Sequence, residues 1–121
     1  MRNLLVSTVR LAGRDYNVSL LFLLMLKLLA DSDKPLSGYD LLKKIRELTE
    51  GYWTPPKSTI YPALRRLQEE GFIEQVDNNL YTITDKGRTL LEQARIQGAI
   101  DDMKAKILVM KELLDKLTSK S

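Results

Sequence analysis

The sequence predicts a mainly α-helical fold with a two-stranded β-wing and a long C-terminal helix. Three observations predict it. Apolar residues recur at helical spacing in three segments between residues 18 and 70. Two short segments with alternating apolar and polar residues, 72–76 and 80–84, follow as paired strands would. The C-terminal segment repeats apolar residues with a mean period of 3.5. This order of elements is that of a winged helix-turn-helix with an additional helix.

The composition limits the class of protein. The 121 residues suffice for one domain plus one further element, and 44% are hydrophobic, so we expect a buried core. The sequence contains no Cys and no His, which excludes disulfides, thiolate metal sites and most nucleophile–base pairs. We therefore expect no enzyme, no cofactor and no metal site. The lack of Cys fits a reducing compartment, and we expect a cytoplasmic protein.

The net charge of +3 is unevenly distributed along the chain. Residues 1–30 carry +3, residues 31–98 carry −1 and residues 99–121 carry +1. A surface that binds nucleic acid must therefore be a local patch. The longest apolar run, residues 18–30, includes Lys27 and is shorter than the roughly 20 residues of a membrane span. We expect no membrane contact and no secretory signal.

The N-terminal segment, residues 1–17, is basic, and its structure is ambiguous from the sequence. A helix there would end at Gly13, because the preceding apolar residues fall at helical spacing. These residues are Leu4, Leu5, Val9 and Ala12.

Residues 18–97 are expected to form the winged domain. Its first helix covers the apolar run 18–30. Ser37 is expected to cap the second helix in a capping box with Asp40, and Gly51 to end it. Gly38 is expected to serve packing. The predicted buried stripe of the second helix consists of Leu41, Leu42, Ile45 and Leu48.

The third helix, which ends near residue 70, is predicted to be half buried. At 100° per residue its apolar side chains fall on one face, namely Ile60, Ala63, Leu64 and Leu67. The opposite face is polar and partly basic. Pro62 lies in the first turn if Ser58 is the cap, and it costs one hydrogen bond if the cap is Thr54 or Pro56.

The wing and the following helix have clear boundaries. Asp77, Asn78 and Asn79 are expected to form a tight turn, since Asn tolerates positive φ. Thr84 or Asp85 is expected to cap a helix whose apolar residues are Leu90, Leu91, Ala94 and Ile96.

Residues 98–121 are predicted to form a helix that pairs with another helix. The apolar residues are spaced 4, 3, 4, 3, 4 and 3, an unbroken a/d seam over three heptads. Gly98, inside the seam, is expected to mark a bend. The predicted dimerisation residues are Ile96, Ile100, Met103, Ile107, Met110, Leu114 and Leu117.

Three motifs resemble the PadR family of transcriptional regulators. They are LSGYDLLKKIRELTEG at 36–51, STIYPALRRLQEEGFIE at 58–74 and YTITDKGRTLLEQA at 81–94, and the resemblance covers residues 21–94. It implies a winged helix-turn-helix that dimerises through its C-terminal helix, often helped by the N-terminal helix. It also implies binding to pseudo-palindromic operators, usually as a repressor. The single C-terminal helix is similar to that of the short subgroup of the family.

We therefore predict a homodimer that binds double-stranded DNA, with the third helix in the major groove. Side chains of the third helix are expected to reach bases or phosphates: Lys57, Ser58, Thr59, Tyr61, Arg65 and Arg66. The second helix is expected to hold the DNA backbone through Ser37, Tyr39, Lys43 and Lys44, and Lys86 and Arg88 to add contacts beyond the wing. For the lysines of the second helix, an ordinary solvated face is an equal alternative.

Two features depart from the family pattern. Family wings are longer and carry Arg or Lys, whereas this wing has Asp77 near its tip. In some relatives a Trp on the dimer helix stacks with planar drugs, but this sequence has no aromatic residue after Tyr81, so a small-molecule effector has no support. The alternative function is a winged-helix protein-interaction subunit without specific DNA recognition. The near-neutral winged domain favours that alternative, and Arg65 with Arg66 favours DNA.

Overall fold

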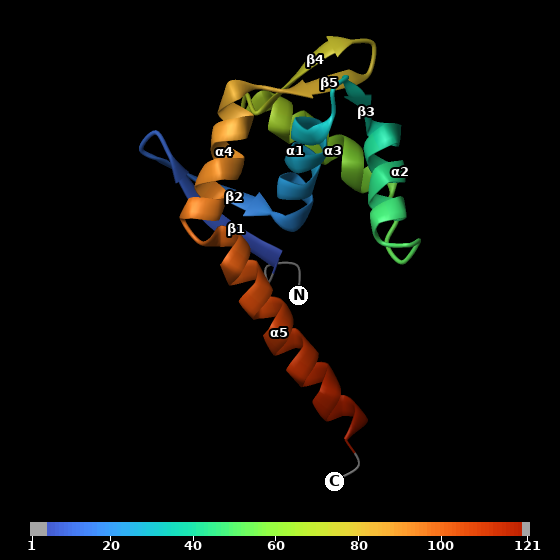
Figure 1. The fold of residues 1–121 in the computed structure, drawn as a ribbon, viewed down its shortest axis with the longest axis vertical. Helices are drawn as coiled ribbons and strands as arrows, with labels where there is room; N and C mark the ends of the chain where they lie inside the picture. The colour runs from blue at the N-terminus through green and yellow to red at the C-terminus, as the bar shows by residue number, and fades with distance from the viewer. Residues whose placement is uncertain (1–4, 120–121) are drawn as a thin grey trace. The chain divides into compact units, whose positions relative to one another are not determined.

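The computed structural model describes residues 5–119, and the chain divides into two compact units. One unit, Leu21–Leu91, holds the helix-turn-helix and the wing. The other combines Met1–Leu20 with Glu92–Ser121. The first unit consists of helices with a small sheet, and the second consists of a β-hairpin with a long helix (Figure 1).

The first unit has the predicted order of elements. Its helices are α1 Leu20–Asp31, α2 Gly38–Leu48, α3 Lys57–Glu69 and the start of α4 Asp85–Ile96, and its strands are β3 Leu36–Ser37, β4 Ile73–Asp77 and β5 Leu80–Ile83. The strands form an antiparallel sheet of order β3-β5-β4. The predicted winged helix-turn-helix is confirmed. The wing sheet, however, contains β3, a two-residue strand that was not predicted.

The core of this unit consists of the apolar faces of its helices and of buried side chains from all three strands, which are Leu36, Ile73, Tyr81 and Ile83. Its fully buried side chains include Met25, Leu26, Leu41, Ile45, Ile60, Leu64, Leu67, Ile73 and Leu90. The predicted burial of Leu48 is wrong, because 63% of this residue is exposed. Leu48 is the last residue of α2, and the chain then turns sharply through Glu50 and Gly51, which both have positive φ.

Pro62 lies in the second turn of α3. The helix begins at Lys57 with Pro56 as its N-cap, so the alternative with a Ser58 cap is wrong. Pro62 has no N–H, and the carbonyl of Ser58 therefore lacks its helical donor. One missing hydrogen bond near an exposed helix start is a modest cost, because that carbonyl can bind water.

The second unit begins with a β-hairpin. Its strands are β1 Val6–Leu11 and β2 Arg14–Ser19, which pair antiparallel. The helical alternative for the N-terminal segment is therefore wrong from Val6 onward, and Leu4 lies outside the described residues. Ala12 and Gly13 have φ of 51° and 78°, the geometry of a tight hairpin turn. Val9 and Val18 are buried on one face of the hairpin, whose other face is exposed.

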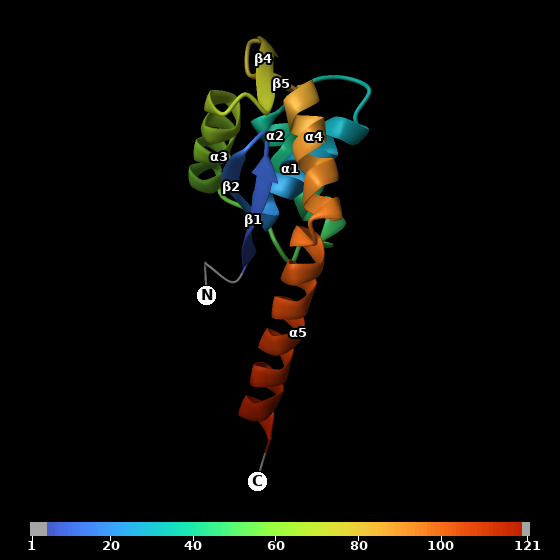
Figure 2. The same ribbon diagram turned by 90° about the vertical axis from the view of Figure 1, so that its left-hand side faces the viewer.

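The second unit ends with α5 Ala99–Thr118, a continuous helix of 20 residues (Figure 2). Gly98 precedes it with φ of 81°, so the predicted bend is confirmed. The prediction of an unbroken seam is wrong, because this bend separates α5 from Ile96, which is the last residue of α4. Among residues 5–119, none of the helices combines the length and the hydrophobicity that a bilayer span requires.

Candidate nucleic-acid interface

The exposed face of α3 is the centre of the candidate interface. The four apolar residues predicted to be buried are all buried, and they fix which side of the helix faces solvent. The exposed residues of α3 are Lys57, Ser58, Thr59, Tyr61, Pro62, Arg65 and Arg66, followed by Gln68 and Glu69 in the last turn. The structure therefore brings the six predicted residues of α3 together on one accessible ridge.

The N-terminus of α3 favours an anion. Pro56 provides no side-chain hydrogen bond to the first turn, and that turn contains no acidic residue. Because the first amides of a helix have no intrahelical acceptor, the amides of Lys57 and Ser58 are available to an external acceptor. The helix dipole and the Lys57 ammonium add positive potential at the same place. A phosphate group is the anion that such a helix start binds most readily.

The two arginines of α3 have different surroundings. The guanidinium carbon of Arg66 lies 5.3 Å from the centroid of the Phe22 ring on α1, a cation–π contact within the first unit. Arg66 therefore contributes to packing even though it is exposed. Arg65 is exposed on the centre of the polar face. From the sequence, both arginines are predicted to contact DNA. Only the fold shows that Arg66 also contacts Phe22.

Tyr61 packs against the start of α2. A methyl group on Gly38 would lie 2.9 Å from Cε1 and 3.1 Å from Cζ of Tyr61. The ring therefore occupies the space that a side chain at position 38 would need. Tyr61 nevertheless remains 40% exposed. Gly38 thus has the packing role expected of it, and it sets where the Tyr61 ring lies on the interface.

The start of α2 is held by the predicted capping box. The Asp40 amide donates to the Ser37 hydroxyl at 3.0 Å, and the Ser37 amide donates to the Asp40 carboxylate at 2.9 Å. This backbone hydrogen bond from Ser37 is the main reason that the pKa of Asp40 is lowered. The Ser37 oxygen already accepts one hydrogen bond in the cap, and its O–H remains a donor.

Basic residues of α2 line a shallow hollow beside this cap. Tyr39, Lys43 and Lys44 are exposed, as a backbone-contacting surface requires. The hollow has a volume of about 200 Å³ and is lined by Lys34, Leu36, Asp40, Lys43, Lys44 and Glu47. Lys34 was not predicted, because it precedes the helix and its approach to Lys43 and Lys44 depends on the turn into β3.

Lys86, which is predicted to contact DNA, lies at the C-terminal end of α3 and remains exposed. Its Nζ donates to the carbonyl of Glu70 at 2.7 Å and lies 4.9 Å from the centroid of the Phe72 ring. A cation at a helix C-terminus is stabilised by the free carbonyls and by the dipole. Arg88, two residues further on, is exposed.

The wing is joined to α4 through Thr84. The Thr84 hydroxyl donates to the carbonyl of Gly71 at 2.7 Å and accepts from the amide of Gly87 at 3.1 Å. Of the two predicted caps for α4, Thr84 is therefore the one that acts. The α3–wing–α4 segment is held at both ends by side-chain hydrogen bonds, which favours a rigid presentation of α3.

The wing tip is polar and acidic. Asn78 and Asn79 form the predicted tight turn, with φ of 61° at Asn79. The Asp77 carboxylate accepts from the Asn78 amide at 2.8 Å and so stabilises the turn. Glu74 and Val76 are also exposed on β4. A negatively charged wing is a poor surface for DNA phosphates.

The predicted dimerisation residues lie mostly on the surface. Met103 is buried and Met110 is half-buried, whereas Ile96, Ile100, Ile107, Leu114 and Leu117 are exposed. The apolar surface of α5 is also wider than the predicted seam. Val109 and Leu113 are exposed as well, and with Ala105, Lys106 and Met110 they line an apolar hollow of about 230 Å³. In the sequence, the spacing of four residues between Ala105, Val109 and Leu113 indicates that they share one face of a helix.

Comparisons with known proteins agree with this arrangement. The profile of the transcriptional regulator PadR-like family matches residues 25–93, more than half of the chain. The negative transcriptional regulator PadR of Bacillus subtilis is 36% identical over 61 residues, 44% of this chain and 34% of that protein. The transcriptional regulator YqjI of Escherichia coli is 37% identical over 79 residues, 62% of this chain and 37% of that protein. The chain thus spans about a third of the length of these curated relatives.

A solved structure of a relative is similar to part of this chain. The crystal structure of Bacillus subtilis PadR in complex with operator DNA has a TM-score of 0.51 and 32% identity, over 62% of this chain and 45% of that chain. The family and the curated relatives are described as transcriptional regulators, in agreement with a regulator rather than an enzyme. In the described part of the chain, no group of three or more acidic, His or Cys residues is placed to hold a metal ion. By its winged helix-turn-helix and its matched sequence, the chain belongs to the PadR-like family of transcriptional regulators.

Proposed function

We propose that this regulator binds an operator as a homodimer, inserts α3 into the major groove and represses transcription. The observation that carries the proposal is the exposed ridge of α3. It combines an uncapped helix start, three hydroxyl side chains and the exposed Arg65 on a helix whose other face is buried. A relative with 32% identity has been solved with operator DNA, which supports the same mode of binding here.

Contacts outside α3 are proposed to position the DNA backbone. Lys43 and Lys44 are exposed on α2, the element that crosses the backbone in helix-turn-helix proteins. The acidic wing is unsuited to phosphate, and Lys86 is engaged at the end of α3. We therefore assign backbone contacts to α2 and to the start of α3, with Arg88 as the remaining cation beyond the wing.

The dimer is proposed to form through α5. Its exposed apolar side chains would each gain roughly 1.5–3 kcal/mol on full burial, so a bare helix is unfavourable. A two-fold axis makes one surface complementary to itself and presents two copies of α3 to a pseudo-palindromic operator. Repression follows from occupying such an operator, and the curated relative from Bacillus subtilis is described as a negative regulator.

Arg65→Ala tests the reading role of α3. An operator is first selected from a random DNA pool, and affinity is then measured by fluorescence anisotropy over a range of salt concentrations. If Arg65 contacts a base, the variant loses about 1–3 kcal/mol and relaxes specificity at one position; if it contacts a phosphate, the salt slope falls by about one.

The control is Lys27→Ala, which removes an exposed cation from α1, where Lys27 pairs with Asp31 at 3.1 Å. It should leave operator affinity unchanged. Unchanged affinity and salt slope in an Arg65→Ala, Lys57→Ala double variant would exclude α3 as the reading helix.

A second candidate function is a protein-interaction subunit that does not read DNA. The exposed Val76 between acidic residues of the wing favours it, because this surface suits a protein better than a nucleic acid. Retention on a random duplex separates the two functions. A DNA reader binds and elutes with salt, whereas an interaction subunit passes through.

A further inference from the structure

The bend between α4 and α5 lies at a single glycine. The Gly98 amide donates to the carbonyl of Arg95 at 3.3 Å, and the Gly98 carbonyl accepts from the amide of Asp102 at 2.9 Å. The hydrogen bonds of α4 therefore end, and those of α5 begin, at the residue with the widest choice of backbone angles. A Cβ on Gly98 would meet nothing within 4 Å. Packing at Gly98 itself thus does not fix the direction of α5.

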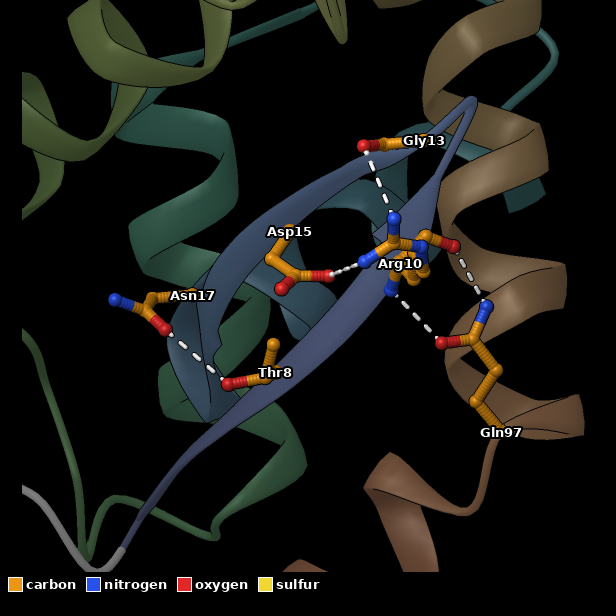
Figure 3. A network of polar contacts seen from close by, with 6 residues as sticks. All are labelled: Thr8, Arg10, Gly13, Asp15, Asn17 and Gln97. Carbon is orange, nitrogen blue, oxygen red and sulfur yellow. Dashed lines mark hydrogen bonds and ion pairs between the residues drawn. The ribbon is translucent and has the colours of Figure 1, made fainter.

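Strand β1 is attached to the residue before the bend. The Arg10 amide donates to Oε1 of Gln97 at 2.8 Å, and Nε2 of Gln97 donates to the Arg10 carbonyl at 2.6 Å (Figure 3). Nε2 also donates to Oε1 of Gln93, one turn earlier in α4, at 2.9 Å. One side chain thus holds both backbone groups of a strand residue, as a neighbouring strand would. Gln97 joins β1 to the end of α4.

The same strand is attached to α5 beyond the bend. Nζ of Lys106 donates to the carbonyl of Val6 at 3.1 Å and pairs with the Asp102 carboxylate at 2.8 Å. The hydrogen bond from Lys106 is the main reason that the pKa of Asp102 is lowered, and a hydrogen bond with the Ser7 side chain lowers it further. Two neighbouring residues of β1 therefore contact the second turn of α5.

The two attachments have the same spacing on the strand and on the helical segment. A strand advances about 13 Å from Val6 to Arg10, at roughly 3.3 Å per residue. A helix advances about 13 Å from Gln97 to Lys106, at roughly 1.5 Å per residue. An extended strand can therefore hold both sides of the bend without distortion.

We propose that β1 is a brace, a strand bound on both sides of the Gly98 bend, and that Gln97 thereby sets the spacing of the half-sites that the dimer reads. α4 begins directly after the wing and is one continuous helix up to the bend. Since the proposed dimer forms through α5, the angle at Gly98 determines how far apart the two copies of α3 lie. Gln97 is then a positioning residue for operator recognition. This inference rests on the proposed homodimer and its operator.

Distances between spin labels test the brace without DNA. The chain has no Cys, so labels can be attached to Thr89→Cys on α4 and Glu112→Cys on α5, which are both exposed. Labelled chains are mixed with an excess of unlabelled chains, so that only distances within one copy are measured. Gln97→Ala should broaden the distance distribution, whereas Glu92→Ala, at another exposed position in the last turns of α4, should leave it unchanged. An unchanged distribution in Gln97→Ala would overturn the brace.

Duplexes with altered half-site spacing test the consequence for recognition. The spacing is changed one base pair at a time around the selected operator, and a duplex with one half-site is measured beside them. Gln97→Ala should keep its affinity for the single half-site. Its preference for the best spacing over the next should fall about tenfold, which is within what two net hydrogen bonds can enforce. Glu92→Ala should keep the wild-type preference, and an unchanged preference in Gln97→Ala would contradict the positioning role.

A brace must be held at both ends, which a second variant tests. Lys106→Met removes the ammonium that binds the Val6 carbonyl and keeps an unbranched side chain. It should broaden the label distances as Gln97→Ala does, with both variants folded by circular dichroism. The double variant should add little, because a strand released at one end no longer restrains the bend. Fully additive effects would mean that the two contacts act independently and would refute the brace.

The outcomes also separate this inference from the proposed function. If the chain is monomeric or binds no operator, the proposed function is wrong, and the label distances still decide whether β1 holds the bend. If the dimer binds its operator but neither the label distances nor the spacing preference responds to Gln97→Ala, the inference is wrong and the proposed function stands.

Discussion

Arg66 and Lys86 each hold a cation close to an aromatic ring, at 5.3 Å from Phe22 and 4.9 Å from Phe72. Both were predicted to contact DNA, and both are used within the first unit. Charge alone therefore does not identify a DNA contact at the scale of single residues. Arg65 and Arg66 are both exposed on α3, and the contact of Arg66 with the Phe22 ring is what distinguishes them.

Gly38 and Tyr61 give a test at the residue scale. Gly38→Ala places a methyl group 2.9 Å from the Tyr61 ring, so the ring must move. Overpacking of this kind costs about 1–3 kcal/mol, and the displaced ring should also weaken operator binding. The free energy of unfolding is measured with urea.

The matched background for this test is Tyr61→Ala. Without the ring, Gly38→Ala should cost less, because only Cδ1 of Leu64, 3.1 Å from the added methyl group, still crowds that position. An equal cost in both backgrounds would show that the Tyr61 ring is not what restricts position 38.

At the scale of elements, α2 depends on its capping box. The cap satisfies amides at the helix start, and Ser37→Ala should cost about 1 kcal/mol of unfolding free energy. The box also makes stability depend on pH. Since the folded chain holds the pKa of Asp40 low, its carboxylate stabilises the fold above the ordinary aspartate pKa of about 3.9. That contribution is lost as the pH falls through the folded pKa.

Asp40→Asn isolates this pH dependence, because the amide keeps an acceptor but does not titrate. Urea unfolding should show the wild type more stable than Asp40→Asn near neutral pH, with a difference that shrinks at acid pH. Asp33→Asn, in the exposed loop before β3, is the control and should show no such change. A difference that grows on acidification would have the wrong sign and would contradict the assigned role.

At the scale of the whole molecule, the proposed dimer through α5 links the state of assembly to the proposed DNA binding. Removing α5 entirely is a poor test, because Ala99 and Met103 are buried and Lys106 contacts β1 within the same unit. A single substitution in the exposed half of the helix avoids this damage. Leu114 lies in the seam and is 59% exposed, and Leu108 lies off the seam and is 63% exposed.

Leu114→Glu should convert the dimer into a folded monomer, whereas Leu108→Glu should remain dimeric. The monomer should bind a duplex with two half-sites about 34 Å apart hardly better than a duplex with one, because the second half-site no longer binds at high effective concentration. Sedimentation equilibrium and titration of both duplexes measure these steps. A Leu114→Glu dimer, or equal effects of the two substitutions, would refute pairing through the seam.

The sequence by itself determined the elements whose signals are local. The capping box of Ser37 and Asp40, the buried face of α3, the Asn78–Asn79 turn and the bend at Gly98 all follow from spacing and from backbone preferences. Each depends on residues within a few positions of one another, and the motifs that resemble the PadR family lie in the same segments. The fold class could therefore be predicted.

Where a residue's partners come from distant parts of the chain, only the tertiary structure decided its conformation and its role. The N-terminal segment has apolar residues that fit both a helical and a strand period, and its hairpin is fixed by contacts with Gln97 and Lys106, far away in sequence. The roles of Arg66 and Lys86 likewise depend on rings that the fold brings to them. Local preference chooses among a few backbone shapes, and long-range packing and hydrogen bonding select the one that leaves the fewest groups unsatisfied.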